Sequence, residues 1–131
     1  AQLTYDAVGE TRVELTGGNA SLYIEDKFYL GRETITDGAG ATAITYAPVA
    51  SYAEISGDNN TDTITITAPA AAHEGQILII NNLAATTAVI DQTATTKLVA
   101  GADVTLTQYD VIMLIFDGTN WLQMAAVTAN S

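Results

Sequence analysis

Few residues in this chain have the types and spacing that chemistry requires. His73 is the only histidine, and it directly precedes Glu74. An imidazole beside a carboxylate could bind a metal ion or act as a general base. Both roles need convergent partners, and the chain has no cysteine, no second histidine and no Ser-His-Asp order. We therefore interpret His73 as a surface-loop residue and expect no metal site and no catalytic site.

Two further patterns are weak versions of known ligand sites. Asp58, Asn59, Asn60 and Asp62 place oxygen ligands close together, but they lack the glycine and glutamate that complete a calcium loop. The glycine-rich sequence of residues 37–42 lacks the lysine and the following helix of a phosphate-binding loop. We interpret the first as a polar turn and the second as a flexible connection, and we expect no cofactor.

Composition excludes several classes of partner. The 131 residues are 48% hydrophobic and 15% charged, with a net charge of −11 and four basic residues. Such a chain can form one globular domain, and it lacks the basic surface that nucleic acid or an anionic membrane would require. There are no cysteines, so disulfides play no part in stability. No charged segment followed by an apolar one opens the chain, so we expect no signal peptide.

The elements that must carry any site are strands. Val104 and Leu106 alternate with polar residues, the continuous apolar run 111–116 follows, and Asp117-Gly118 then marks a hairpin turn. Turn signals recur along the chain at the spacing typical of an all-β protein. We predict an antiparallel, jelly-roll-like β-sandwich without helices, with runs 77–80 and 111–116 buried on both faces. The predicted core comprises Ile64, Ile66, Ile77, Ile79, Val104, Leu106 and several residues of 111–116.

The chain divides by character into two parts. Residues 1–47 form an N-terminal β segment that holds three of the four basic residues, and residues 48–131 form the sandwich body. Two roles stay open for the N-terminal part: an arm that anchors the protein to a larger assembly, or strands that complete the sandwich.

An ordered set of sequence pieces between residues 57 and 127 resembles a β-module of tailed-bacteriophage structural proteins. The pieces are TDTITITAP, EGQILIINN, TTAVID, KLVAGADVTL and an apolar strand leading into DGTNW. Fibre knobs, tail-needle tips and capsid cement or decoration proteins carry modules of this kind. The resemblance implies a jelly-roll-like sandwich, a homotrimer and no enzymatic role.

The resulting hypothesis is a non-enzymatic virion protein that cements or decorates a capsid as a trimer on the major capsid protein lattice or on other virion proteins. The alternative is a tail-fibre or spike knob that binds a host receptor or glycan. Trp121 is expected in the core or at a subunit interface, and a sugar-stacking role is the less frequent reading. The interface candidates are Arg12, Val13, Leu15, Lys27, Arg32, Tyr109 and Trp121.

Overall fold

The computed structural model describes residues 2–5, 11–14, 29–36, 43–56, 62–69, 74–128 and 130, and these residues contain strands and no helix. The strands are β1 (Gln2–Tyr5), β2 (Thr11–Glu14), β3 (Arg32–Ile35), β4 (Ala43–Tyr46), β5 (Tyr52–Ile55), β6 (Asp62–Ile66), β7 (Ile77–Asn82), β8 (Ala88–Ile90), β9 (Thr96–Lys97), β10 (Val104–Leu106), β11 (Val111–Phe116) and β12 (Trp121–Gln123). The predicted all-β class is confirmed.

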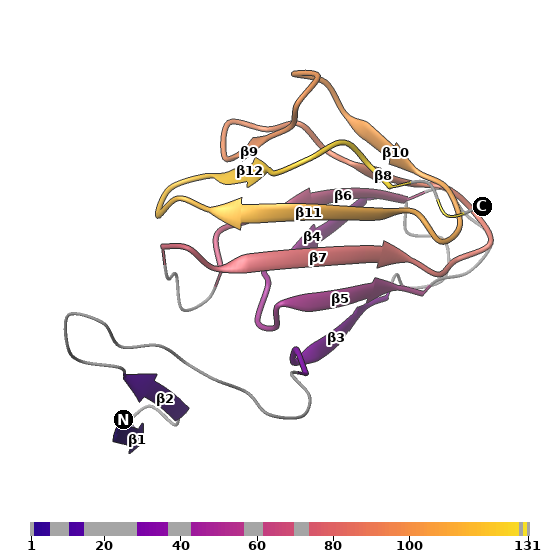
Figure 1. The fold of residues 1–131 in the computed structure, drawn as a ribbon. Helices are drawn as coiled ribbons and strands as arrows, with labels where there is room; N and C mark the ends of the chain where they lie inside the picture. The colour runs from indigo at the N-terminus through magenta and orange to yellow at the C-terminus, as the bar shows by residue number, and fades with distance from the viewer. Residues whose placement is uncertain are drawn as a thin grey trace.

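Two sheets form the sandwich (Figure 1). One has six strands in the order β3-β5-β7-β11-β12-β9, and the other has four in the order β10-β8-β6-β4. β1 and β2 pair with each other in a separate antiparallel sheet. β3 and β4 belong to the two large sheets, so the sandwich includes residues before position 48, which the sequence predicts to belong to the N-terminal part.

Strand direction differs from the antiparallel expectation. The pairs β3–β5, β5–β7, β4–β6, β6–β8 and β9–β12 are parallel, whereas β7–β11, β11–β12 and β8–β10 are antiparallel. From β3 to β8 the chain crosses to the other sheet after every strand, so neighbours in a sheet are two strands apart in sequence and run the same way. A turn signal shows that the chain turns. It does not show whether the turn stays within a sheet or crosses the sandwich.

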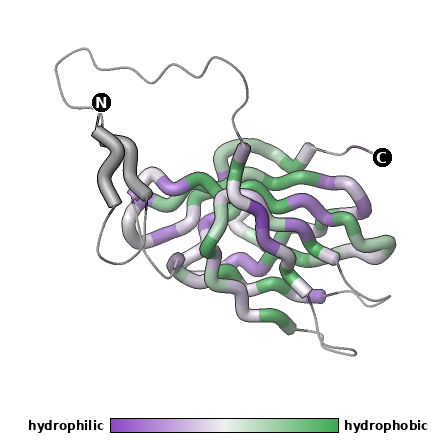
Figure 2. Tube along the Cα trace, turned by 90° about the horizontal axis from the view of Figure 1, so that it is seen from below, coloured by the Kyte–Doolittle hydropathy of each residue, from purple (hydrophilic) through white to green (hydrophobic). Residues whose placement is uncertain are grey.

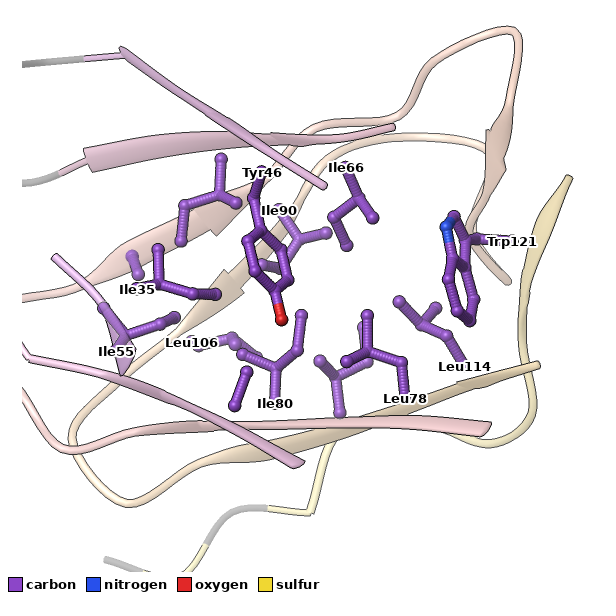
Figure 3. Packing of buried hydrophobic residues seen from close by; sticks show 14 of the residues in the cluster. Ile35, Tyr46, Ile55, Ile66, Leu78, Ile80, Ile90, Leu106, Leu114 and Trp121 are labelled. Atoms are coloured by element: carbon purple, nitrogen blue, oxygen red, sulfur yellow. The ribbon is translucent and has the colours of Figure 1, made fainter. Parts of the chain in front are cut away.

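Hydrophobic and hydrophilic residues alternate along the strands (Figure 2), and one set of apolar side chains packs between the sheets (Figure 3). Ile64, Ile66 and Leu106 are fully buried, as predicted. The inward residues of the two apolar runs are Leu78, Ile80, Ile112, Leu114 and Phe116. Ile77, at 40% exposure, and half-buried Ile79 point outward, so their assignment to the core was wrong. Val104 is partly buried and packs against the core.

Trp121 packs at one end of the core and links the two sheets. Its side chain is fully buried, its ring lies 5.2 Å from that of Phe116, and its Nε1 donates a hydrogen bond to the Thr67 carbonyl at 2.9 Å. Thr96 donates a second bond across the sandwich, from its buried Oγ1 to the Ile66 carbonyl at 3.1 Å. Because these donors belong to the six-stranded sheet and the acceptors lie on or just after β6, they fix the two layers relative to each other.

A carboxylate bridges the sheets at the β3–β4 edge. Glu33 Oε1 accepts hydrogen bonds from the Tyr46 hydroxyl and from the backbone N–H groups of Val49 and Ala50. Burial, together with the hydrogen bond and negative charge of Glu33, raises the pKa of Tyr46 above its ordinary value. The tyrosine therefore stays protonated, and continues to donate to Glu33, beyond the pH at which a tyrosine in water ionises.

Candidate functional site

The outer side of the six-stranded sheet carries two rows of cross-strand neighbours. The first row runs Arg32–Tyr52–Ile79–Met113 over β3, β5, β7 and β11, and the second runs Ile77–Ile115–Leu122–Lys97 over β7, β11, β12 and β9. We call the apolar centre of these rows the apolar face, made of Ile77, Ile79, Met113, Ile115 and Leu122. Ile77 and Met113 are 40% and 37% exposed, and the other three are half-buried. Five large apolar side chains thus form one continuous surface.

The outer side of the four-stranded sheet has the opposite character. Its outward residues include Thr45, Thr63, Thr65 and Thr105, with Val89 as the larger apolar member. Thr65 Oγ1 donates to the Asp91 carboxylate at 3.0 Å, which is the kind of contact a water-facing sheet forms. The sandwich therefore presents one polar and one apolar outer surface.

Basic residues stand at both margins of the apolar face. Arg32 lies on edge strand β3, where its Nη1 contacts Glu54 Oε2 at 3.1 Å, and Lys97 lies on edge strand β9 beside Leu122. An exposed pair such as Arg32–Glu54 stabilises the fold by about 0–1 kcal/mol. The Arg32–Glu54 pair therefore contributes little to folding. Arg32 and Lys97 are two positive charges at the rim of the apolar face, on a chain whose net charge is −11.

The interface candidates from the sequence are distributed over different parts of the molecule. Arg12 and Val13 lie in β2, and Leu15 and Lys27 lie outside the described residues. Arg32 borders the apolar face, and Tyr109 lies in a loop at one end of the sandwich. Trp121 has no exposed surface, so its side chain neither contacts another subunit nor stacks on a sugar in this fold. Of these candidates, Arg32, Tyr109 and Trp121 lie in the sandwich, and the structure places the three in different parts of it.

The structure describes few of the candidates for catalysis and ion binding. His73, Asn59 and the glycine-rich sequence 37–42 lie outside the described residues, while Asp62 is buried at the start of β6. Within the described ranges, no cluster of histidine and carboxylate side chains has the arrangement of a metal site. No helix in those ranges could cross a membrane.

Tyr109 borders an open cleft at the end of the sandwich where β7 and β10 finish. The cleft has a volume of about 560 Å³ and lies between the loop after β7 and the loop after β10. Most of its lining carries a hydroxyl or an amide, from Thr86, Thr87, Thr107, Gln108, Tyr109 and Asn130. Tyr109 is 51% exposed and provides the aromatic surface.

One buried amide joins the two loops of this cleft. Asn82 is fully buried, and its Nδ2 donates to the carbonyls of Thr86 at 2.9 Å and Leu106 at 3.0 Å. Its Oδ1 accepts from the N–H of Ala84 at 3.0 Å. The sequence predicts only a turn at Asn81-Asn82, because two consecutive asparagines after an apolar strand do not indicate that the second one points into the protein.

Fold and surfaces together define a two-sheet β-sandwich whose distinctive features are an apolar outer surface and a preformed loop cleft. The model of the phage depolymerase C-terminal beta sandwich domain matches residues 33–122, and the chain belongs to this family. It is thus a bacteriophage β-sandwich protein associated with the virion. The matched residues coincide with the sandwich from β3 to β12.

A solved structure supports the same fold. One chain of a structure described as a chaperone-substrate complex superimposes with a TM-score of 0.52 over 76% of this chain, at 20% sequence identity. The matched region is 17% of that longer chain. No curated protein is similar enough to count as a match.

Proposed function

We propose that this domain is a non-catalytic structural part of a phage tail fibre, spike or depolymerase, where it holds copies of the chain together through the apolar face. Membership of a family defined on the C-terminal sandwich of phage depolymerases supports a position on the tail. The capsid-cement hypothesis receives no comparable support. Binding of a host receptor or glycan is compatible with this role, because the loops at the end of the sandwich lie off the apolar face.

The observation that carries the proposal is the apolar character of both sides of β7 and β11. Residues 77–80 and 111–116 are apolar at inward and outward positions alike, a pattern typical of strands covered on both faces. Among the residues that the structure describes, the four-stranded sheet covers the inward side, and Ile77 and Met113 on the outward side remain 40% and 37% exposed. A second covering layer from another copy would remove the outward side chains from water, at about 25 cal/mol for each Å² of apolar surface.

A homotrimer is the proposed assembly, in line with the phage modules that the sequence resembles. Closed rotational symmetry lets every copy bury the same surface, so no apolar face is left to drive open-ended growth. Arg32 and Lys97 stand at the rim, and each neighbouring copy brings an excess of carboxylates to meet them. Rim charges of this kind act mainly on association rate and orientation.

Sedimentation equilibrium of the full chain tests the proposal. Met113→Glu places a charge in the centre of the apolar face, and Thr105→Glu places the same charge on the polar outer surface as a matched control. We expect the wild type and Thr105→Glu to sediment as trimers and Met113→Glu as a monomer with an unchanged β-type circular dichroism spectrum. A wild-type monomer, or a trimer that tolerates Met113→Glu, would overturn it.

A further inference from the structure

The edges of the two large sheets differ in how they are protected. An edge strand exposes a row of backbone N–H and C=O groups, and proteins guard it by keeping it short, by placing charges on it or by turning a charge inward. β9 and β10 are edge strands of two and three residues. β3, the other edge of the six-stranded sheet, carries the exposed charge of Arg32 and the carboxylate of Glu33, which reaches Tyr46 on the opposite sheet. Three of the four edges therefore have a recognised form of protection.

β4 is an edge strand without these features. Its sequence, Ala43-Ile44-Thr45-Tyr46, holds no charge and no proline, and within the described residues it pairs with β6 alone. The Tyr46 backbone faces β6, because its carbonyl accepts a hydrogen bond from the Thr67 N–H at 2.8 Å. Alternate residues of a parallel strand face the same neighbour, so the N–H and C=O groups of Ala43 and Thr45 point away from β6. Both residues are exposed, and two donors and two acceptors therefore line an open edge.

The inner side of β4 also remains partly open. Ile44 packs against the core but is partly buried, whereas Ile64, its neighbour on β6, is fully buried. A further strand on the open side of β4 would place a side chain beside Ile44. The edge thus offers backbone hydrogen bonds together with apolar surface, which are the two components of strand addition.

The chain contains a strand of matching length and sequence pattern. β1 (Gln2–Tyr5) has four residues like β4, and after the first residue both strands read aliphatic, threonine, tyrosine. β1 pairs with β2 in a sheet that joins neither large sheet, and two strands alone are marginally stable in water. If β1 joins β4, β2 becomes the outermost strand, and its sequence supplies the charges of Arg12 and Glu14 that the edge of β4 lacks.

We propose that β1 of one copy adds to the open edge of β4 in a second copy, so that neighbouring copies exchange their β1–β2 pairs. Within a single chain the β1–β2 pair and the β4 edge are both formed and yet belong to separate sheets, which makes another copy the acceptor. In a closed ring each copy gives one pair and receives one. The inference rests on the proposed trimer, because so few hydrogen bonds do not offset the entropy that association costs, and the apolar face must first bring the copies together.

Crosslinking between single-cysteine variants of this cysteine-free chain tests the exchange. Thr4→Cys places a thiol on β1, and Thr45→Cys places one on the open edge. Thr34→Cys on β3 is the matched control, since Thr34 is an exposed threonine whose backbone faces away from β5 on a protected edge. Isotope-labelled Thr4→Cys chains are refolded together with unlabelled Thr45→Cys or Thr34→Cys chains and treated with a short bismaleimide. Mass spectrometry then identifies the crosslinks that join a labelled chain to an unlabelled one.

We expect crosslinks between positions 4 and 45 to exceed those between positions 4 and 34 about fivefold or more, in samples that sediment as trimers. Ala43→Pro removes an outward N–H that the sandwich does not use, so adding it to Thr45→Cys should keep the trimer and reduce these crosslinks about threefold or more. Crosslinking that survives Ala43→Pro undiminished would contradict strand addition.

Two further results would overturn the exchange while leaving the assembly through the apolar face intact. One is a trimer that crosslinks equally at positions 45 and 34. The other is a trimer in which a Thr4→Cys/Thr45→Cys double variant crosslinks within its own chain and the mixture yields no mixed dimer, because β1 would then belong to its own sandwich. A monomer in sedimentation would overturn both proposals.

Discussion

Ile79 and Ile80 are adjacent on β7 and face opposite sides of the sheet, so a pair of alanine variants separates folding from assembly. Ile80 is fully buried between the sheets, opposite Ala53 and Ile112. Ile79 lies half-buried on the apolar face, between Tyr52 and Met113. Both substitutions remove the same atoms from neighbouring positions of one strand.

The two environments give different free-energy changes. Ile80→Ala should lower the free energy of unfolding by about 2–5 kcal/mol, because it leaves a cavity in a packed core. Ile79→Ala removes about three methylene equivalents worth about 0.8 kcal/mol each when fully buried, and because most of the Ile79 side chain is already buried, about 1.5–2 kcal/mol of this is lost in the isolated chain. The remaining contribution, less than about 1 kcal/mol per copy, should appear only when copies associate.

Urea unfolding at a low and a high protein concentration measures both quantities. We expect Ile80→Ala to lower the midpoint by the same amount at both concentrations, and Ile79→Ala to lower it less than Ile80→Ala at the low concentration and further at the high concentration, where the wild type gains stability by association. If Ile79→Ala costs as much as Ile80→Ala in the monomer, the outward side of β7 is already covered by the chain itself, and the reasoning is refuted.

Three further predictions concern local features. The pKa of Asp117 is lowered by hydrogen bonds from the N–H groups of Asn120 and Thr119, so the stability that this carboxylate contributes is complete above its ordinary pKa and is lost as the pH falls below it. We expect the urea midpoint of Asp117→Asn to fall less steeply with decreasing pH than that of the wild type. An unchanged dependence of the midpoint on pH would exclude Asp117 as a source of the acid sensitivity. The pKa of Tyr46 is raised, so its contribution to stability is complete below about pH 10 and is lost at higher pH; Tyr46→Phe should reduce the alkaline loss of stability above about pH 10, and a loss as steep as in the wild type would contradict the assignment. Gly118 has a φ of 94°, and a Cβ at this position would lie 3.8 Å from the Glu74 Cβ, an ordinary contact distance, so Gly118→Ala should cost about 1–2 kcal/mol through backbone strain alone, and thermal unfolding with no change in midpoint would refute it.

Local sequence patterns were sufficient to predict much of the fold. Alternation identified Ile64, Ile66 and Leu106 as inward residues, and Asp117-Gly118 correctly marked the turn between β11 and β12. Pairing direction could not be predicted, because it depends on which sheet the chain enters after a turn, and local residue types do not encode that choice. Parallel pairs such as β5–β7 arise from crossings between the sheets.

The candidate surfaces were partly visible in the sequence. The continuous apolar runs indicated strands covered on both faces, and in the described part of the chain inward residues such as Leu78 and Leu114 are fully buried, whereas the outward Met113 is 37% exposed. Tyr109 was singled out as an interface residue, but the cleft beside it depends on Asn82, whose inward direction follows from its position at the end of β7. Contacts between segments far apart in sequence cannot be read from local patterns.

Thiol accessibility on the apolar face tests the central claim most directly. The chain contains no cysteine, so Met113→Cys introduces a single thiol of similar polarity at the centre of that face, and Thr105→Cys introduces one on the polar outer surface. The account predicts that maleimide labels the thiol at position 113 more slowly as protein concentration rises, while labelling at position 105 stays constant. Equal labelling of both thiols at every concentration, in samples that sediment as trimers, would contradict it.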